Sequence, residues 1–129
     1  MKYKNKITNG YHSAKEYRRA NELKLLERAG HISELCEQVT FELQPYFKCD
    51  GRTERAIKYI ADFTYNKNGN LFVEDVKGFK TDVYKIKRKM LLFKYPEIKF
   101  IETWKYAPYA ISLNPLANSR YVHYQKVDA

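Results

Sequence analysis

The pattern of apolar and polar positions along the 129-residue chain predicts helices and strands in a definite order, and a helix comes first. Residues 13–29 contain good helix formers throughout the interior of the segment. Ser13 is a natural N-cap, Glu16 stands at the capping-box position, and Gly30 supplies the stop. We therefore expect one helix here, preceded by a loose basic arm over residues 1–12.

Three strands are predicted after this helix. Residues 36–43 alternate apolar and polar side chains with a period of two, which is typical of a strand with one buried face. Two more strands are expected at about 56–65 and 71–77. Asn68-Gly69 joins them and is a strong hairpin signal, because both turn residues tolerate positive φ. The segment 44–55 between the first two strands is expected to be a loop.

A second helix is predicted over residues 82–95. Thr81 can cap this helix, and Pro96 helps to end it. Its apolar residues recur at the spacing i, i+3, i+7 and i+10, so we expect them to form the stripe that faces the core. These residues are Val83, Ile86, Met90 and Phe93.

A short fourth strand is expected at residues 97–102. It should run parallel to the third strand, because a strand, helix, strand run in one sheet crosses over right-handed. Residues 104–129 are rich in aromatic side chains, and no long helix or strand is predicted there. The chain has the length of one domain. We therefore predict a single α/β (α+β) domain with a core over residues 13–103 and an aromatic C-terminal extension over 104–129.

Composition and charge narrow the functional classes. Apolar residues make up 44% of the chain and aromatic residues 16%, which is enough to bury a core. The 24 Lys and Arg residues exceed the 15 Asp and Glu residues and give a net charge of +9. Such a charge suits a polyanionic partner such as nucleic acid, although many intracellular proteins are basic for no specific purpose.

Several classes of protein are not indicated. Cys36 and Cys49 and the three scattered histidines lack the spacing of a zinc site, so free thiols in a reducing cytosol are expected. The first residues lack the apolar region of a signal peptide, and no stretch approaches 18 uninterrupted apolar residues. We therefore expect a cytoplasmic protein that does not insert into a membrane.

The predicted hairpin brings acidic residues together. With Asn68-Gly69 as a two-residue turn, the strand register sets Asp62 opposite Asp75. Directly opposed residues have Cβ atoms roughly 4.5–5.5 Å apart, so two carboxylates there repel each other unless a cation neutralises them. Lys77 lies two residues beyond Asp75 and projects from the same face. We expect Asp62, Asp75 and Lys77 to converge on one small volume.

An isolated Asp-x-Lys sequence is common, and it is most often part of a solvated polar face. Here the flanking segments "YIADF" and "LFVEDV" are otherwise suited to burial, and a buried unpaired charge is costly, which favours a functional site. The first helix adds Glu16, at one end of the stripe that should meet the sheet. Glu16 is either a metal ligand or only a helix cap, and Glu22 is the weaker alternative on the same helix.

This pattern resembles the PD-(D/E)xK (restriction-endonuclease-like) nuclease superfamily. That superfamily carries an acid on its second core strand, here Asp62, and an acid-x-Lys motif on its third, here "EDVKG" with Asp75 and Lys77. More narrowly, "YIADFTY" and "VEDVKGFKTDVYKIKRK" resemble a family of small phage and prophage proteins of unassigned function that is grouped with these nucleases. The resemblance spans residues 11–103. The proline of the motif's name is replaced by Ala61, at a position that varies in the superfamily.

The resemblance implies a set of metal ligands. In the superfamily, two acids and a main-chain carbonyl hold Mg²⁺ or Mn²⁺, which here implies Asp62, Asp75 and the carbonyl of Val76, all hard oxygen ligands. Glu16 would bind a second ion or a metal-bound water. Lys77 would orient the attacking water or help to deprotonate it. Glu74 is expected to point to the opposite face of the sheet.

The resemblance also implies a function. It points to a Mg²⁺-dependent endonuclease, a hydrolase that cuts DNA, with RNA as the other polymer that the same site would fit. Small members of the superfamily include Holliday-junction resolvases, so branched DNA and a homodimer are expected if the chain is structure-selective. For a phage-encoded protein the cytoplasm would be that of the host. The alternative is a non-catalytic nucleic-acid-binding module that retains the nuclease fold. The basic residues expected either to neutralise phosphates or to form an ordinary solvated face are Lys80, Lys85, Lys87, Arg88 and Lys89.

Overall fold

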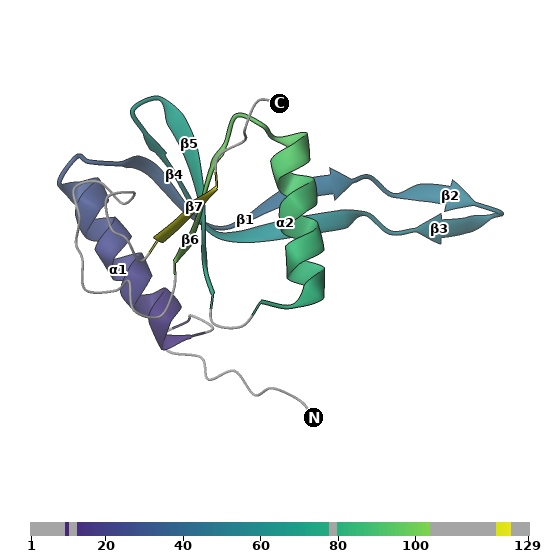
Figure 1. Ribbon diagram of the computed structural model, residues 1–129, viewed down its shortest axis with the longest axis horizontal. Coiled ribbons are helices and arrows are strands. Elements are labelled where there is room, and N and C mark those ends of the chain that lie inside the picture. Colours follow the sequence, from purple (N-terminus) through teal and green to yellow (C-terminus); the bar gives the residue numbers. More distant parts are fainter. Residues whose placement is uncertain (1–9, 11–12, 78–79, 104–120, 125–129) are drawn as a thin grey trace.

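A computed structural model describes Gly10 and residues 13–77, 80–103 and 121–124. In these residues a mixed sheet carries one helix on each face, and a long two-stranded ribbon extends away from the body (Figure 1). The predicted basic arm, apart from Gly10, and most of the predicted C-terminal extension lie outside the described residues. The α/β fold class is confirmed.

The first helix, α1, spans Ala14–Arg28, close to the predicted bounds. Ser13 caps it as expected: its Oγ accepts a hydrogen bond of 3.1 Å from the backbone N–H of Glu16. Gly30 follows with a φ of 82°, the left-handed conformation in which a helix commonly ends. The cap and stop signals of the sequence therefore set both ends of α1.

The central hairpin forms as predicted. Its strands are β4, Ile57–Lys67, and β5, Asn70–Val76. Asn68 and Gly69 have φ values of 51° and 78°, so both turn residues are left-handed, as a two-residue turn of type I′ requires. The ladder pairs Lys67 with Asn70 at the turn and Thr64 with Val73 further along. The turn chemistry therefore fixes the register of the two strands that carry the predicted acids.

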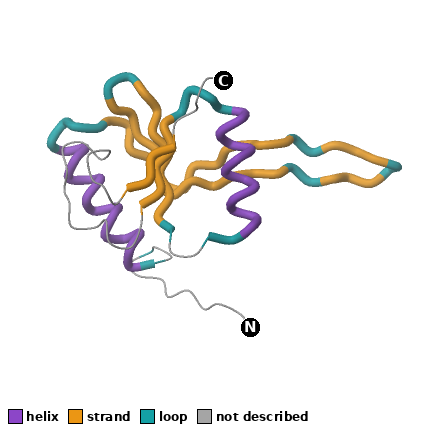
Figure 2. The backbone as a smooth tube through the Cα atoms, in the orientation of Figure 1, coloured by secondary structure: helices purple, strands orange, loops and turns teal. Residues whose placement is uncertain are grey.

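The prediction of a loop over residues 44–55 is wrong. The first strand, β1, spans Ser33–Gln44, and two short strands follow, β2 at Phe47–Cys49 and β3 at Arg52–Glu54. They pair with each other as a hairpin that continues the ribbon of β1 and β4 (Figure 2). All residues of this hairpin are exposed, so no apolar alternation marks them, and the turn at Asp50-Gly51 was the one available signal.

The second helix, α2, spans Asp82–Lys94, and Thr81 caps it by accepting a hydrogen bond from the N–H of Tyr84. The predicted buried stripe is wrong for three of its four members, because Val83, Ile86 and Phe93 are exposed and only Met90 packs against the core. The helix instead buries Tyr84 and Leu91. The spacing of apolar residues favours a different inner face. Tyr84 lies on the buried face of the helix, where its hydroxyl donates a hydrogen bond to the buried carboxylate of Glu102.

The fourth predicted strand is β6, Lys99–Thr103, and it lies parallel to β5 as expected. A further strand, β7 at Tyr121–Tyr124, pairs antiparallel with β6. The described part of the C-terminal extension therefore adds to the sheet edge, and the strand order is β1-β4-β5-β6-β7.

The sheet separates two cores. Phe72 and Ile101 pack in the core beneath α1, whereas their chain neighbours Val73 and Phe100 pack in the core beneath α2, so the two helices cover opposite faces. Within the described residues, no helix is long and apolar enough to cross a membrane. Cys36 and Cys49 are free, exposed thiols, as predicted.

Candidate active site

The candidate site lies where β4 and β5 separate. Their ladder ends at the pair Phe63 and Glu74, one step before the predicted opposition of Asp62 and Asp75. Backbone N–H groups instead donate hydrogen bonds across the gap to the two carboxylates. The N–H of Asp62 donates to Oδ1 of Asp75 at 2.8 Å, and the N–H of Val76 donates to Oδ2 of Asp62 at 2.9 Å. The acids are therefore neighbours as expected, but they accept hydrogen bonds instead of facing each other as a ladder pair.

The strand β4 changes face at Asp62. Tyr59 and Ala61 pack in the core beneath α2, whereas Phe63 and Tyr65 pack in the core beneath α1. Residues two apart in a regular strand share a face, so the alternation is broken between Ala61 and Phe63. This break frees the Asp62 side chain from a position in either core.

Its neighbour β1 breaks at the same level. Leu35 packs against the core beneath α1 and Phe41 against the core beneath α2, although an even spacing should place both on one face. Between them, Gln38 has a left-handed φ of 53°, which costs a non-glycine residue about 1 kcal/mol. Gln38 is absent from the ladder between β1 and β4, and its side chain lies near enough to Asp62 to oppose the rise in the pKa of that carboxyl group.

Glu16 reaches this break from α1. Its Oε2 accepts a hydrogen bond of 3.2 Å from Nε2 of Gln38. Burial, together with the nearby charge of Asp62, raises the pKa of Glu16 to about 7. The N–H of Glu16 makes the helix-cap bond, while its carboxyl group lies at the site. The cap and the site therefore use different atoms of one residue.

Asp75 is the most deeply buried acid of the site, with 1% of its surface exposed. Its Oδ2 atom is buried and has no hydrogen-bond partner, and Nζ of Lys77 lies 3.9 Å away. Burial raises the pKa of Asp75 to about 6, against the opposing charge of Lys77. Burial also raises the pKa of Asp62. Three carboxyl groups therefore bear a desolvation cost that a bound cation would offset.

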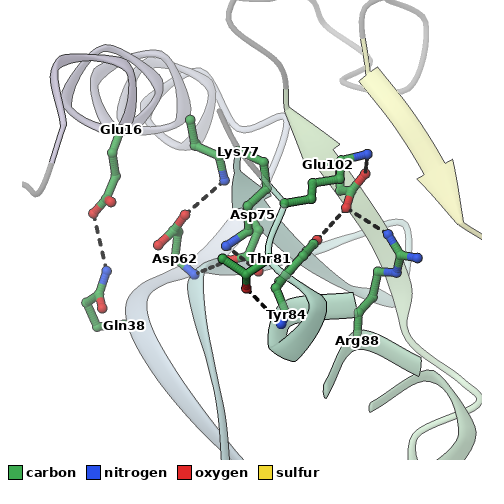
Figure 3. Close-up of polar contacts among 11 residues, drawn as sticks. Glu16, Gln38, Asp62, Asp75, Lys77, Thr81, Tyr84, Arg88 and Glu102 are labelled. Carbon is green, nitrogen blue, oxygen red and sulfur yellow. Dashed lines mark hydrogen bonds and ion pairs between the residues drawn. The ribbon is translucent and has the colours of Figure 1, made fainter. Parts of the chain in front are cut away.

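These residues form a band of side chains across the end of the sheet (Figure 3). Glu16 and Gln38 contact each other at one end, the aspartates and Lys77 follow, and Nζ of Lys77 lies 4.1 Å from the ring centroid of Tyr84. Tyr84 donates a hydrogen bond to Glu102, which is fully buried. The band joins elements of both helices at the end of the sheet where the strands diverge.

The donor atoms suit a hard divalent cation, but they are not assembled around one point. No group of three or more His, Cys, Asp or Glu side chains in the described part of the chain is arranged to hold a metal ion. The unpartnered Oδ2 of Asp75 is the atom that fits a cation best, since it has lost its water without gaining a donor. Asp62 lies beside it and Val76 follows it in the chain.

Two other acids lie in or beside a separate network beneath α1. Glu74 points away from the site, as predicted, and accepts hydrogen bonds from Arg19, Tyr65 and Thr103. Glu22 lies beside this network: Nη1 of Arg19 is 3.6 Å from its Oε1, but neither of its buried carboxylate oxygens has a hydrogen-bond partner.

The predicted nucleic-acid-binding residues divide into two groups. Lys80 and Arg88 both pair with buried Glu102, at 2.9 Å and 3.0 Å, so they neutralise an internal carboxylate. Burial alone would raise the pKa of Glu102, but the hydrogen bonds from Tyr84 and Lys80 bring it below its usual value. The other predicted cations, Lys85, Lys87 and Lys89, make no ion pair within the described residues.

Sequence reasoning missed part of the site. Gln38 looked like an ordinary polar position of a strand, and its left-handed backbone has no sequence signal. Tyr84 and Glu102 were read as parts of a helix and a strand only. Their roles depend on contacts across the sheet, which the order of residues does not reveal.

Comparison with known proteins identifies a family. The family model described as "Protein of unknown function (DUF1064)" matches residues 2–110. Searches of curated proteins and of solved structures found no match. Because the family model covers most of the sequence, the chain belongs to the DUF1064 family.

Proposed function

We propose that this chain is a divalent-metal-dependent nuclease that hydrolyses phosphodiester bonds of DNA. The observation that carries the proposal is the state of Asp75. It is a buried carboxylate with one unpartnered oxygen, and it lies beside a second aspartate and a lysine. Structural acids are normally satisfied, so an unsatisfied one next to a cation is a candidate for chemistry.

Each residue has a distinct role in this proposal. Asp62 and Asp75, with the carbonyl of Val76, would hold Mg²⁺ or Mn²⁺, and Glu16 would bind a second ion or a metal-bound water. Such an ion supplies an activated water and a positive charge for the developing negative oxygens. Lys77 lies at the same carboxylate and can orient that water or donate a hydrogen bond to a phosphate oxygen. The net charge of +9 favours the approach of a polyanion.

A second candidate function is a nucleic-acid-binding module without catalysis. It is favoured by the absence of an assembled metal-binding group among the described residues. It is also favoured by the backbone N–H groups that already occupy one oxygen of each aspartate. In the nuclease, substrate or metal would have to compete with these two hydrogen bonds.

The two functions are separated by a cleavage panel. Linear, single-stranded, supercoiled and branched DNA are incubated with Mg²⁺, with Mn²⁺ or with chelator. We expect cutting only with metal, a loss of about 10²–10³-fold in rate for Asp75→Asn and a comparable loss for Lys77→Met. Lys48→Met is the matched control, because Lys48 is an exposed lysine of β2, in the ribbon outside the candidate site. It should cut like the parent.

Metal binding has a readout that does not depend on activity. Mg²⁺ should raise the melting temperature of the parent protein and leave that of Asp75→Asn unchanged, because a ligand that binds only the folded state stabilises it. If the parent binds DNA, never cuts it with either metal, and both variants bind equally well, the nuclease proposal is wrong and the binding module is the better reading.

A further inference from the structure

A pocket of about 270 Å³ lies beside Asp75 and Lys77. One wall comes from β4 through Lys58, Tyr59 and Ile60, and the other comes from α2. The residues contributed by α2 and its cap are Thr81, Val83, Tyr84 and Lys87. The pocket therefore opens directly onto the candidate site, between the sheet and the first turns of the helix.

The side chains that line the pocket carry a net positive charge. Three lysines line it, Lys58, Lys77 and Lys87, against a single carboxylate, that of Asp75. Within the described residues, the side chains of Lys58 and Lys87 make no ion pair. Lys58 lines the pocket from β4 and Lys87 lines it from α2, so a monoanionic phosphodiester group in the pocket would lie near lysines of two elements.

The rest of the lining is apolar and aromatic. Ile60 is 57% exposed and Val83 is 62% exposed, although both border the pocket. The rings of Tyr59 and Tyr84 lie behind them, with centroids 6.3 Å apart. Exposed apolar side chains between lysines suit a ligand that has both a charged group and a less polar body, such as a phosphate with its sugar.

We infer that this pocket binds a phosphodiester group of a nucleic-acid strand next to the one that is cut, with Lys58 and Lys87 as its phosphate ligands. That the neighbouring phosphodiester is the one cut rests on the proposed function. That the pocket binds a phosphodiester rests on the residues that line it. Lys58 is a residue that the sequence pattern did not single out. Lys87 is thereby distinguished from Lys85 and Lys89, which lie on the same helix but outside this pocket.

The experiment must distinguish binding in this pocket from binding to any basic face of α2. The experiment measures binding of a fluorescent oligonucleotide by anisotropy in chelator, where no metal-dependent cutting occurs, over a range of salt concentrations. The test variant is Lys58→Ala with Lys87→Ala. The matched control is Lys85→Ala with Lys89→Ala, which removes the same charge from two exposed lysines of α2.

We expect the pocket variant to lose about tenfold in affinity and to lower the slope of log K against log salt by about 1.4 for a single strand, the value for two phosphate contacts. The control variant should lose less than about threefold. DNA and RNA strands of one sequence are both tested. Loss on both identifies the shared phosphodiester backbone as the ligand, and loss on DNA alone identifies the deoxyribose polymer.

Equal losses in the two double variants would overturn the inference, because a basic face without a pocket behaves in that way. Unchanged binding in the pocket variant would overturn it as well. These outcomes are distinct from failure of the proposed function. If the parent never cuts DNA but the pocket variant alone loses binding, the nuclease proposal fails and the pocket remains. If the parent cuts DNA with metal and the pocket variant binds and cuts like the parent, the nuclease proposal stands and the pocket inference fails.

Discussion

Glu74 and Asp75 are adjacent in the chain and equally buried, but their carboxylates differ in how many hydrogen bonds they accept. Glu74 faces α1, where Arg19, Tyr65 and Thr103 donate hydrogen bonds to its carboxylate. Asp75 lies at the other face with one backbone donor, and its second oxygen has none. A strand of period two separates neighbours in this way. The carboxylate of Glu74 is thus fully hydrogen-bonded, whereas that of Asp75 keeps one oxygen that no donor reaches.

This difference indicates which acid serves stability and which serves chemistry. A fully hydrogen-bonded buried network makes the fold more rigid. Removing one member lowers stability, because the remaining charged group stays buried without its partner. An unsatisfied carboxylate costs stability, and such a cost is typical of functional sites. The comparison therefore makes predictions of opposite sign for the two neighbours.

The largest effect is expected from the network beneath α1. Arg19→Met should destabilise the protein by about 3–5 kcal/mol, because Glu74 then keeps its charge without its cation. Urea unfolding measures the change, and Arg18→Met, at an exposed position of the same helix, is the control. Adding Glu74→Leu to Arg19→Met should recover part of the loss. A loss below about 1 kcal/mol would mean that the network contributes little.

The opposite sign is expected at the neighbouring acid. Asp75→Asn should stabilise the metal-free protein by about 1–2 kcal/mol at pH 8, because it removes a buried charge while an oxygen remains to accept from Asp62. The same urea series measures it. A destabilised Asp75→Asn variant would show that the charge of Asp75 is already compensated by Lys77, and the contrast with Glu74 would disappear.

A smaller effect depends on pH. Burial raises the pKa of Glu22 to about 7, even though the charge of Arg19 opposes this. The folded state therefore binds the proton more tightly than the unfolded state, whose pKa is near 4.5, and the free energy of unfolding falls as pH rises from 4.5 to 7. Glu22→Gln should remove this fall and gain about 1–2 kcal/mol at pH 8 with little change at pH 4. Exposed Glu97→Gln is the control, and an equal gain at both pH values would contradict the prediction.

The smallest effect concerns the register that brings the acids together. Gly69 has a φ of 78° with open space around it, so Gly69→Ala meets no clash and costs only backbone strain. We expect a loss of about 1 kcal/mol in thermal or urea unfolding with cleavage unchanged. A large loss of cleavage without loss of stability would show that the turn acts on the site by another route.

The sequence was a good guide wherever a local signal fixed the geometry. Ser13 and Thr81 mark the starts of the helices, and Asn68-Gly69 fixes the hairpin register, because caps and two-residue turns depend on a few adjacent residues. From that register the proximity of Asp62 and Asp75 followed. Their predicted roles as metal ligands, and those of Glu16 and Lys77, stay predictions.

The predictions from sequence were wrong where contacts with residues distant in the chain, or exposure to solvent, decided the structure. The apolar stripe of α2 pointed outward, because Tyr84 and Arg88 find the buried carboxylate of Glu102 across the sheet. The strand pair β2 and β3 was taken for a loop, because an exposed ribbon has no buried face to produce alternation.

By itself the sequence determined the order of the two helices and of four strands, β1, β4, β5 and β6. It also determined the hairpin register and the gathering of acids near one lysine, because these follow from neighbouring residues and from strand geometry. The tertiary structure alone decided which acids are satisfied. It placed Arg19 on Glu74, turned Gln38 toward Glu16, and left an oxygen of Asp75 without a donor. Satisfaction of a buried charge depends on groups brought from far along the chain, and only packing determines where those groups lie.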